Sequence, residues 1–367
     1  MRLIKEATEE DGKGMARGRQ TTSGSRSKKG RRRGGFGRAL ASMLLLLVLC
    51  GAGAAAYLWF VPYGPARETF VEILPGSSTT TIGRQLESAG MIPTQYAFDA
   101  MRILKPAVLK AGTYRFAGPD TVRNIYNRIH RGDVYTIAVT IPEGSTVFDI
   151  AARLQGAKLG SAADFLAATK TETELIRDLD PQAASLEGYL FPDTYRFSPT
   201  ARSIEVAAVM VKRFRAEAAQ IGLKNDVHNV VTTASLVERE TAVDNERPLV
   251  ASVFANRLEK KMPLMTDPSV IYGLQLAGAW RGTIYAGDLK RDTPYNTYLH
   301  MGLPPGPVAN PGMKSLRAAM DPAHTNYLYF VAAGANPQGK SLFAATLEEH
   351  NRNVNGYRNT MKKAGDR

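Results

Sequence analysis

The residues from Ala39 to Val61 form an uninterrupted apolar run of 23 residues without a charged side chain. Such a run is long enough to cross a bilayer as a helix with some tilt. Tyr57 and Trp59 lie near its end, where aromatic rings favour the membrane interface. The run is also longer than the roughly 7–15 apolar residues of a cleaved signal peptide, which is the alternative. It therefore predicts a single uncleaved transmembrane helix at residues 39–61, and the folded part of the chain must follow it.

Positive charge is concentrated before this run. The first 38 residues contain 12 Lys and Arg but four Asp and Glu, so they carry about +8 of the formal net charge of +13. We expect this tail, residues 1–38, to be disordered because it has almost nothing apolar to bury. By the positive-inside rule the tail stays in the cytoplasm and the body of the protein lies outside. Because the remaining chain carries only about +5, the basic pI does not indicate a nucleic-acid-binding protein.

Two segments of the body share a pattern at a distance of 68 residues. Residues 71–77 and 139–145 are each typical of a strand that runs into a turn, with Gly76 and Gly144 at the same place in the pattern. A helix with apolar residues one turn apart follows each turn. The pattern favours a repeated strand–turn–helix unit, although a Gly-Ser turn before an amphipathic helix can also arise by coincidence. The second unit resembles a carbohydrate-binding LysM element, so residues 68–170 are predicted to be a LysM-like α+β subdomain.

Another pair of similar segments reads Thr-Tyr-Arg-Phe, at residues 113–116 and 194–197, and predicts half-buried strands. The second closes a stretch, residues 186–195, that combines a glycine, several aromatics and two carboxylates and includes Glu187 and Tyr189. Such a stretch could form a sugar-facing loop or an aromatic core strand. The sequence does not decide between the two.

Residues 226–241 place a carboxylate where an apolar residue is expected. Val231 and Ala234 lie on one face of the predicted helix, and Glu238 continues that face. A carboxyl group held against apolar surface has a raised pKa and suits general acid–base catalysis. The alternative is that Glu238 lies at the edge of the apolar face and points to water. Glu240, about 200° further round the helix, is interpreted as an ordinary solvated charge.

The rest of the body alternates helices with polar loops. No His pair has the spacing of a zinc site, the single cysteine is Cys50 in the apolar run, and no Ser lies in a G-x-S-x-G turn. A metal, a cofactor and a Ser hydrolase are therefore not expected. We predict helices at residues 203–221, 226–241 and 246–261, loops at 266–269, 292–298 and 302–312, a strand at 327–331, a turn at 334–337, and a last helix from about 346.

Several motifs taken together resemble one family, the endolytic murein transglycosylases (MltG-like or YceG-like proteins). The resemblance covers about 300 residues, from the membrane anchor to the C-terminus, and leaves out the cytoplasmic tail. The motifs, in chain order, are EGYLFPDTY at 187–195, ASLVERET at 234–241, FANRL at 254–258, TDP at 266–268, PYNTY at 294–298, GLPPGPVANPG at 302–312 and YLYFV at 327–331.

This resemblance implies a membrane-bound enzyme of the bacterial cell wall. The family cleaves the β-1,4 bond between N-acetylmuramic acid and N-acetylglucosamine without water and leaves a 1,6-anhydromuramic end. Glu238 matches its catalytic glutamate, and residues 171–367 are expected to form a mixed α/β catalytic domain. Implied partners are peptidoglycan strands, the inner membrane and the penicillin-binding synthases. A hydrolytic muramidase and a non-catalytic peptidoglycan-binding anchor are the alternatives.

A single carboxylate is enough for this chemistry, because the C6 hydroxyl of the substrate replaces the attacking water. The carboxylates considered as neighbours of Glu238 are Asp267, Glu187 and Asp193. Candidate sugar-binding residues are Glu187, Tyr189, Thr266, Asp267, Asn296, Thr297 and Tyr298. Hydrogen bonding within the loops themselves is the alternative role for the loop residues of this set.

Overall fold

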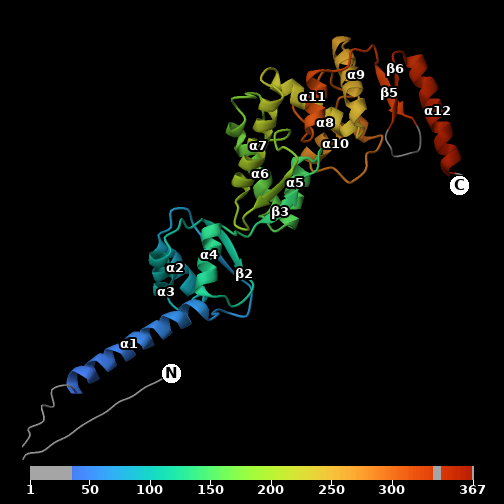
Figure 1. Cartoon of the computed structure of the whole chain (residues 1–367). Coiled ribbons are helices and arrows are strands. Elements are labelled where there is room, and N and C mark those ends of the chain that lie inside the picture. The colour runs from blue at the N-terminus through green and yellow to red at the C-terminus, as the bar shows by residue number, and fades with distance from the viewer. Residues whose placement is uncertain (1–34, 334–339, 366–367) are drawn as a thin grey trace, which may run out of the picture. The chain divides into compact units, whose positions relative to one another are not determined.

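The computed structural model describes residues 35–333 and 340–365, and helices make up most of its regular structure. The α-helices are α1 Gly35–Phe60, α2 Thr79–Ser88, α3 Gln95–Leu104, α4 Val122–Arg131, α5 Val147–Gly156, α6 Ala162–Thr171, α7 Ser203–Gln220, α8 Val227–Glu240, α9 Arg247–Glu259, α10 Asp267–Leu276, α11 Met313–Met320 and α12 Leu347–Gly365. The strands are β1 Thr69–Ile73, β2 Gly112–Phe116, β3 Ile137–Thr140, β4 Thr194–Phe197, β5 Tyr329–Ala332 and β6 Ser341–Ala344. Within the described ranges they pair as β1–β2, β3–β4 and β5–β6, each pair antiparallel. These elements confirm a helix-rich α+β fold (Figure 1).

Helix α1 contains the predicted apolar run except for its last residue, Val61, and begins earlier, at Gly35. The part of it from Gly37 to Phe60 has 24 residues and a mean hydropathy of 2.3, so its length and composition allow it to cross a membrane. The predicted tail, residues 1–38, lies outside the described residues except for its last four, which belong to α1. The turn predicted at 334–337 also lies outside them.

The two segments that the sequence predicts to be repeats fold in the same way. β1 is followed by α2, and β3 is followed by α5. Each of these strands pairs with one of the Thr-Tyr-Arg-Phe segments in the same register, so that Val71 is opposite Tyr114 and Val139 is opposite Tyr195. The repeat is therefore present in three dimensions, whereas the LysM-like identity of the unit stays a prediction.

The turns that leave β1 and β3 are also alike. In residues 74–77 and 142–145, the amide of the last residue donates to the carbonyl of the first, at 3.2 and 3.3 Å respectively. Gly76 and Gly144 have φ angles of +80° and +73°, which only glycine adopts without strain. One turn geometry is thus used twice in the chain.

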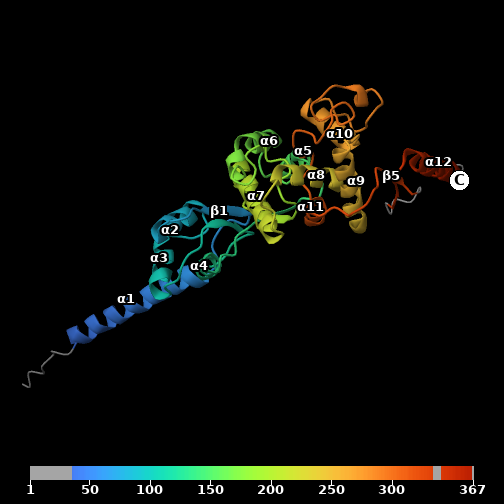
Figure 2. The same ribbon diagram turned by 90° about the horizontal axis from the view of Figure 1, so that it is seen from above.

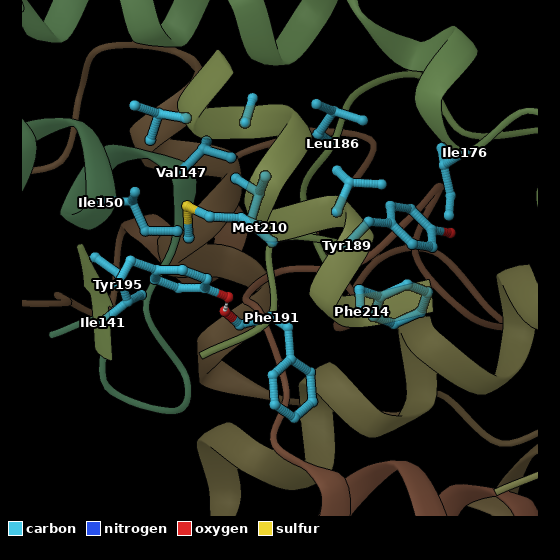
Figure 3. Close-up of a cluster of buried hydrophobic side chains, with 14 of the residues drawn as sticks. Ile141, Val147, Ile150, Ile176, Leu186, Tyr189, Phe191, Tyr195, Met210 and Phe214 are labelled. Atoms are coloured by element: carbon cyan, nitrogen blue, oxygen red, sulfur yellow. Dashed lines mark hydrogen bonds between the residues drawn. The ribbon is translucent and has the colours of Figure 1, made fainter. Parts of the chain in front are cut away.

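A hydrophobic core joins the second repeat to the helices that follow it (Figure 3). Ile150 from α5, Tyr195 from β4 and Met210 from α7 are buried in it. The hydroxyl of Tyr195 donates to the carbonyl of Phe191 at 2.5 Å, so the aromatic stretch forms part of the core. Packing in this part of the chain continues across residue 170, where the sequence analysis places a subdomain boundary.

The helices predicted at 203–221, 226–241 and 246–261 are confirmed as α7, α8 and α9. The prediction of a loop at 266–269 is wrong, because Thr266 is the N-cap of α10 and Pro268 lies in its first turn. Proline is favourable there, since the first N–H groups of a helix have no partner within the helix. The acidic side chain of Asp267 also suits a helix N-terminus.

Helices α8, α9 and α11 lie side by side (Figures 1 and 2). Leu236 and Val237 of α8 pack with Phe254 of α9 and Ala318 of α11 in a second hydrophobic core. This packing brings together the last turn of α8, the start of α9 and the start of α11.

Candidate active site

Helix α8 buries its apolar face as the sequence predicts. Val231 and Ala234 are fully buried, and Glu238 follows one turn later. The side chain of Glu238 is 5% exposed. The alternative that it points to water is therefore wrong.

The surroundings of Glu238 are nevertheless polar, which corrects the expectation that it lies against apolar surface. Its Oε1 accepts a hydrogen bond from Nη2 of Arg247, and its Oε2 accepts one from the backbone N–H of Gly312, both at 2.9 Å. Gly312 is the N-cap of α11, where unpaired N–H groups and the helix dipole favour negative charge. Each carboxylate oxygen keeps a second lone pair for a reacting group.

Arg247 is the first residue of α9, and its side chain is also 5% exposed. Besides Glu238, its guanidinium donates to Oγ of Ser315 at 3.0 Å and to Oδ1 of Asp244 at 2.6 Å. These contacts use the rigid fork of donors that distinguishes arginine from lysine. Arg247 is therefore fixed in place and offsets the charge of Glu238.

A second carboxylate, that of Glu143, comes from the turn after β3. Its Oε2 lies 3.8 Å from the same Nη2 of Arg247 that binds Glu238. A Cβ atom at position 312 would lie 1.9 Å from Oε1 of Glu143, so this carboxyl lies directly against Gly312. Burial raises the pKa of Glu143, and the charge of Glu238 raises it further, while Arg247 and Lys314 act in the opposite direction.

Asn310 holds the turn that carries Glu143. Its carbonyl accepts from the amide of Gly144 at 2.9 Å, and its own amide donates to the carbonyl of Ser145 at 3.0 Å. Its side chain donates to Oε1 of Glu187 at 2.7 Å and accepts from the amide of Leu190 at 2.8 Å. Three segments that are far apart in the sequence thus meet at one buried side chain.

Two predicted sugar-binding residues belong to this interior network. Glu187 is 2% exposed, and its Oε2 accepts from the amide of Val147 at 2.9 Å. Burial raises the pKa of Glu187 to about 8. Tyr189 is fully buried, and its hydroxyl donates to Asp180. Neither side chain is accessible to a sugar in this structure, so of the two roles left open for the stretch 186–195 the core role describes it.

The other predicted sugar-binding residues fall into two groups. Thr266, Asn296 and Thr297 are buried. The side chain of Asn296 bonds within its own loop, whereas the amide of Thr266 donates to Oγ1 of Thr297 at 3.0 Å and joins the start of α10 to that loop. Asp267 is exposed and accepts from the hydroxyl of Tyr298 at 2.7 Å. Asp267 and Tyr298 line a pocket of about 290 Å³.

Glu240 lines the same pocket, and its surroundings correct the sequence interpretation. It is not an ordinary solvated charge: burial raises its pKa to about 7, and the nearby charge of Asp267 contributes. Residue spacing placed Glu240 away from Glu238, but it gave no information about the parts of α9, α10, β5 and α12 that line this pocket with it.

A larger cavity, of about 610 Å³, reaches the outer partners of Arg247, although Glu143, Glu238 and Arg247 themselves do not line it. Its lining includes Asp244, which binds Arg247, and Lys314, which forms an ion pair with Asp244. Arg317 and Asp321 also line it, so a polymer with hydroxyl and charged groups finds donors and acceptors there.

Sequence reasoning missed Glu143, the second carboxylate of this site. Among the described residues, none of Asp267, Glu187 and Asp193 has a hydrogen bond or ion pair with Glu238, whereas Glu143 shares its arginine. The available signal was the Pro-Glu-Gly-Ser turn of the second repeat. Its contact with α8 joins segments about 95 residues apart, which helix periodicity cannot detect.

The chain matches the YceG-like family over residues 71–356. It is 35% identical over 308 residues to the endolytic murein transglycosylase of Bacillus subtilis, covering 78% of this chain and 84% of that protein. It is 32% identical over 355 residues to the endolytic murein transglycosylase of Streptococcus pneumoniae, covering 85% of this chain and 64% of that protein. The crystal structure of a YceG-like protein from Listeria monocytogenes superposes with a TM-score of 0.51 at 33% identity, covering 78% of this chain and 99% of that one.

Replacing Arg247 should show how much its charge stabilises the buried carboxylate of Glu238. We expect Arg247→Met to lower the free energy of unfolding by about 3–5 kcal/mol, because the buried carboxylate loses its charge partner. In an Arg247→Met/Glu238→Gln protein the loss should be clearly smaller than the sum of the two single losses. Urea denaturation of the four proteins measures this, and additive losses would contradict the pairing.

Glu240 should make stability depend on pH. Its pKa of about 7 in the folded state lies above the ordinary value of 4.5, so its contribution is complete below pH 4.5 and is lost as pH rises through 7. Glu240→Gln should therefore be more stable than the parent at pH 8 relative to pH 5, by at most about 3 kcal/mol. Thermal unfolding at both pH values measures the difference, with Glu259→Gln on the exposed surface of α9 as control. Equal pH dependence in all three proteins would contradict this.

Proposed function

Because the chain belongs to the YceG-like family, we propose that it is an endolytic murein transglycosylase anchored in the bacterial cytoplasmic membrane. It cleaves the β-1,4 bond between N-acetylmuramic acid and N-acetylglucosamine without water. The products end in 1,6-anhydromuramic acid, and the cut terminates nascent glycan strands. No cofactor takes part.

The observation that carries this proposal is the position of Glu238, the first glutamate of the ASLVERET motif. It is buried at the junction of α8, α9 and α11, and its oxygens face Arg247 and Gly312. In the reaction the bond from C1 to the leaving O4 breaks, and a bond from C1 to O6 of the same muramic residue forms. O4 gains a proton and the C6 hydroxyl loses one, so proton transfer by a positioned carboxylate is the chemistry required.

The glycan strand occupies the cavity lined by Asp244 and Lys314, which Asp244 links through Arg247 to Glu238. Asp267 and Tyr298 are the remaining sugar-binding candidates, because their side chains reach a pocket. Glu187, Tyr189, Thr266, Asn296 and Thr297 support the site from the interior. The peptidoglycan synthases that make nascent strands are the proposed protein partners.

One observation favours a second candidate, a hydrolytic muramidase. Glycosidases that use water need two carboxylates, one as acid and one as base or nucleophile. Glu143 supplies a second carboxylate near Glu238. The two candidates differ by one water in the product.

Glu238→Gln should abolish glycan cleavage while the protein stays folded. The amide cannot exchange a proton, and losing general acid–base catalysis costs on the order of 10²–10⁴ in rate. It can accept only one of the two hydrogen bonds of Glu238, so stability should fall by about 1–3 kcal/mol. Mass spectrometry of wild-type products should show ends about 18 mass units lighter than hydrolysed ends, because the intramolecular reaction adds no water.

Circular dichroism at the assay temperature confirms that the variant is folded, and Glu259→Gln, on the exposed surface of α9, should keep full activity. Reducing ends in the wild-type products would favour the muramidase. An active Glu238→Gln protein would overturn the catalytic assignment.

The apolar helix is proposed to be an uncleaved anchor with the N-terminus in the cytoplasm and the catalytic part outside. The basic residues before α1 support this orientation. An alkaline phosphatase fusion after residue 70 should be active, because that enzyme works only after export. An inactive fusion, or a mature protein that begins after residue 55, would contradict the anchor.

A further inference from the structure

We propose that Glu143 and Glu238, which face the same guanidinium nitrogen of Arg247, divide the proton transfers between them. Glu143 is the general acid that protonates the leaving O4, and Glu238 is the base that takes the proton of the C6 hydroxyl. This division of roles rests on the proposed transglycosylase function.

The hydrogen bonds of the two carboxylates favour these roles. Both oxygens of Glu238 accept hydrogen bonds, one from the charged Arg247 and one from the N–H of Gly312, so this group is held as an acceptor. Among the described residues, Glu143 has no hydrogen-bond donor within reach, and its contact with Arg247 is 3.8 Å long. Its side chain is 50% exposed and can meet a substrate.

The internal repeat shows that the turn itself does not need a carboxylate. Glu143 corresponds to Pro75 in the first copy, where residues 74–77 form the same turn with the same hydrogen bond. Proline is well suited to that position of a turn, because its φ is already fixed. Glu143 therefore stands where the fold is satisfied by a residue without a charge.

The turn that carries Glu143 is held against Glu238 from several sides. Nη1 of Arg239, on α8, donates to the carbonyl of Gly144 at 3.2 Å. A Cβ atom on Gly144 would lie 3.5 Å from Cγ of Glu238. Asn310 binds the same turn from the opposite loop. Glu143 is thus positioned by the scaffold, as proton transfer requires.

The surroundings of Glu143 raise its pKa above the ordinary value. Burial is the main cause that raises its pKa, and the negative charges of Glu238 and Asp244 raise it further. Arg247 and Lys314 lower it, and the net direction is upward. Two interacting carboxylates do not take up protons independently, and the upward direction for Glu143 agrees with its role as the proton donor.

The proton balance closes with these two groups. Glu143 gives its proton to O4 as the C1–O4 bond breaks, and Glu238 receives the proton of the C6 hydroxyl as the C1–O6 bond forms. The pair begins and ends with one proton, which returns from Glu238 to Glu143 after the product leaves. No water or other reactant is consumed.

Glu143→Gln tests the acid role with two substrates. On peptidoglycan strands the variant should be slower by about 10²–10⁴-fold, with KM within a few-fold of wild type. On a muramic acid oligosaccharide with a dinitrophenolate leaving group the loss should be under about tenfold, because that group leaves without a proton. Wild-type activity on strands should fall as pH rises through the pKa of the acid, and the variant should lack this limb.

The comparison variants separate this inference from the proposed function. Glu238→Gln should stay inactive on both substrates, since the base is still required, and the exposed Glu174→Gln should behave as wild type. Wild-type-like cleavage of strands by Glu143→Gln would overturn the acid role and leave the transglycosylase assignment intact. A Glu143→Gln protein that is equally slow on both substrates would also overturn it.

Gly312→Ala offers a second test that changes neither carboxylate. The added methyl would displace Glu143, and the backbone φ of –79° at this position suits alanine, so the protein should fold. The substitution should slow wild type at least tenfold and have little further effect in the Glu143→Gln protein, because coupled residues are not additive. If Gly312→Ala slowed wild type and the Glu143→Gln protein by the same factor, the role of Glu143 would be contradicted.

Discussion

Burying a carboxylate costs several kcal/mol unless a partner compensates its charge, and the arrangement around Glu238 follows from this. Arg247 provides the compensating charge, and Gly312 adds an N–H donor at the start of α11. Both partners need their own helix to start at the right place. The junction of α8, α9 and α11 therefore forms a hydrophobic core and also holds the Arg247–Glu238 ion pair. A shift of one of these helices would disturb both the core and the ion pair.

A second constraint comes from Asn310, which connects this junction to two segments that precede α8 in the chain. Its backbone and side chain satisfy buried polar groups in the turn after β3 and in the stretch 186–190. Buried polar groups left without partners are expensive, so such a node fixes the segments around it. The turn with Glu143 is consequently held in place next to Glu238 by the same bonds that close the interior.

How much of this arrangement the sequence predicts depends on how far apart in the chain the contacting residues lie. The apolar face of α8 and the position of Glu238 on it are local, and periodicity found them. The repeat was also found, since its two copies can be compared directly. The ion pair, the Asn310 node and the burial of Glu240 join segments from different parts of the chain, and no local pattern encodes them. The prediction of a loop at 266–269 was wrong for a related reason, because Asp and Pro are frequent both in loops and in the first turn of a helix.

The repeat also explains how a site can arise at this place in the fold. Both copies form a strand, a turn with glycine at positive φ and a helix, and both pair with a Thr-Tyr-Arg-Phe strand in one register. The fold constrains the glycine strongly and the residue before it weakly, since proline and glutamate both occur there. Only in the second copy does that free position face a buried arginine that already binds another carboxylate. The repeated unit thus has one position that its turn does not constrain, and in the second copy that position lies beside Glu238, where a carboxylate can reach the same arginine.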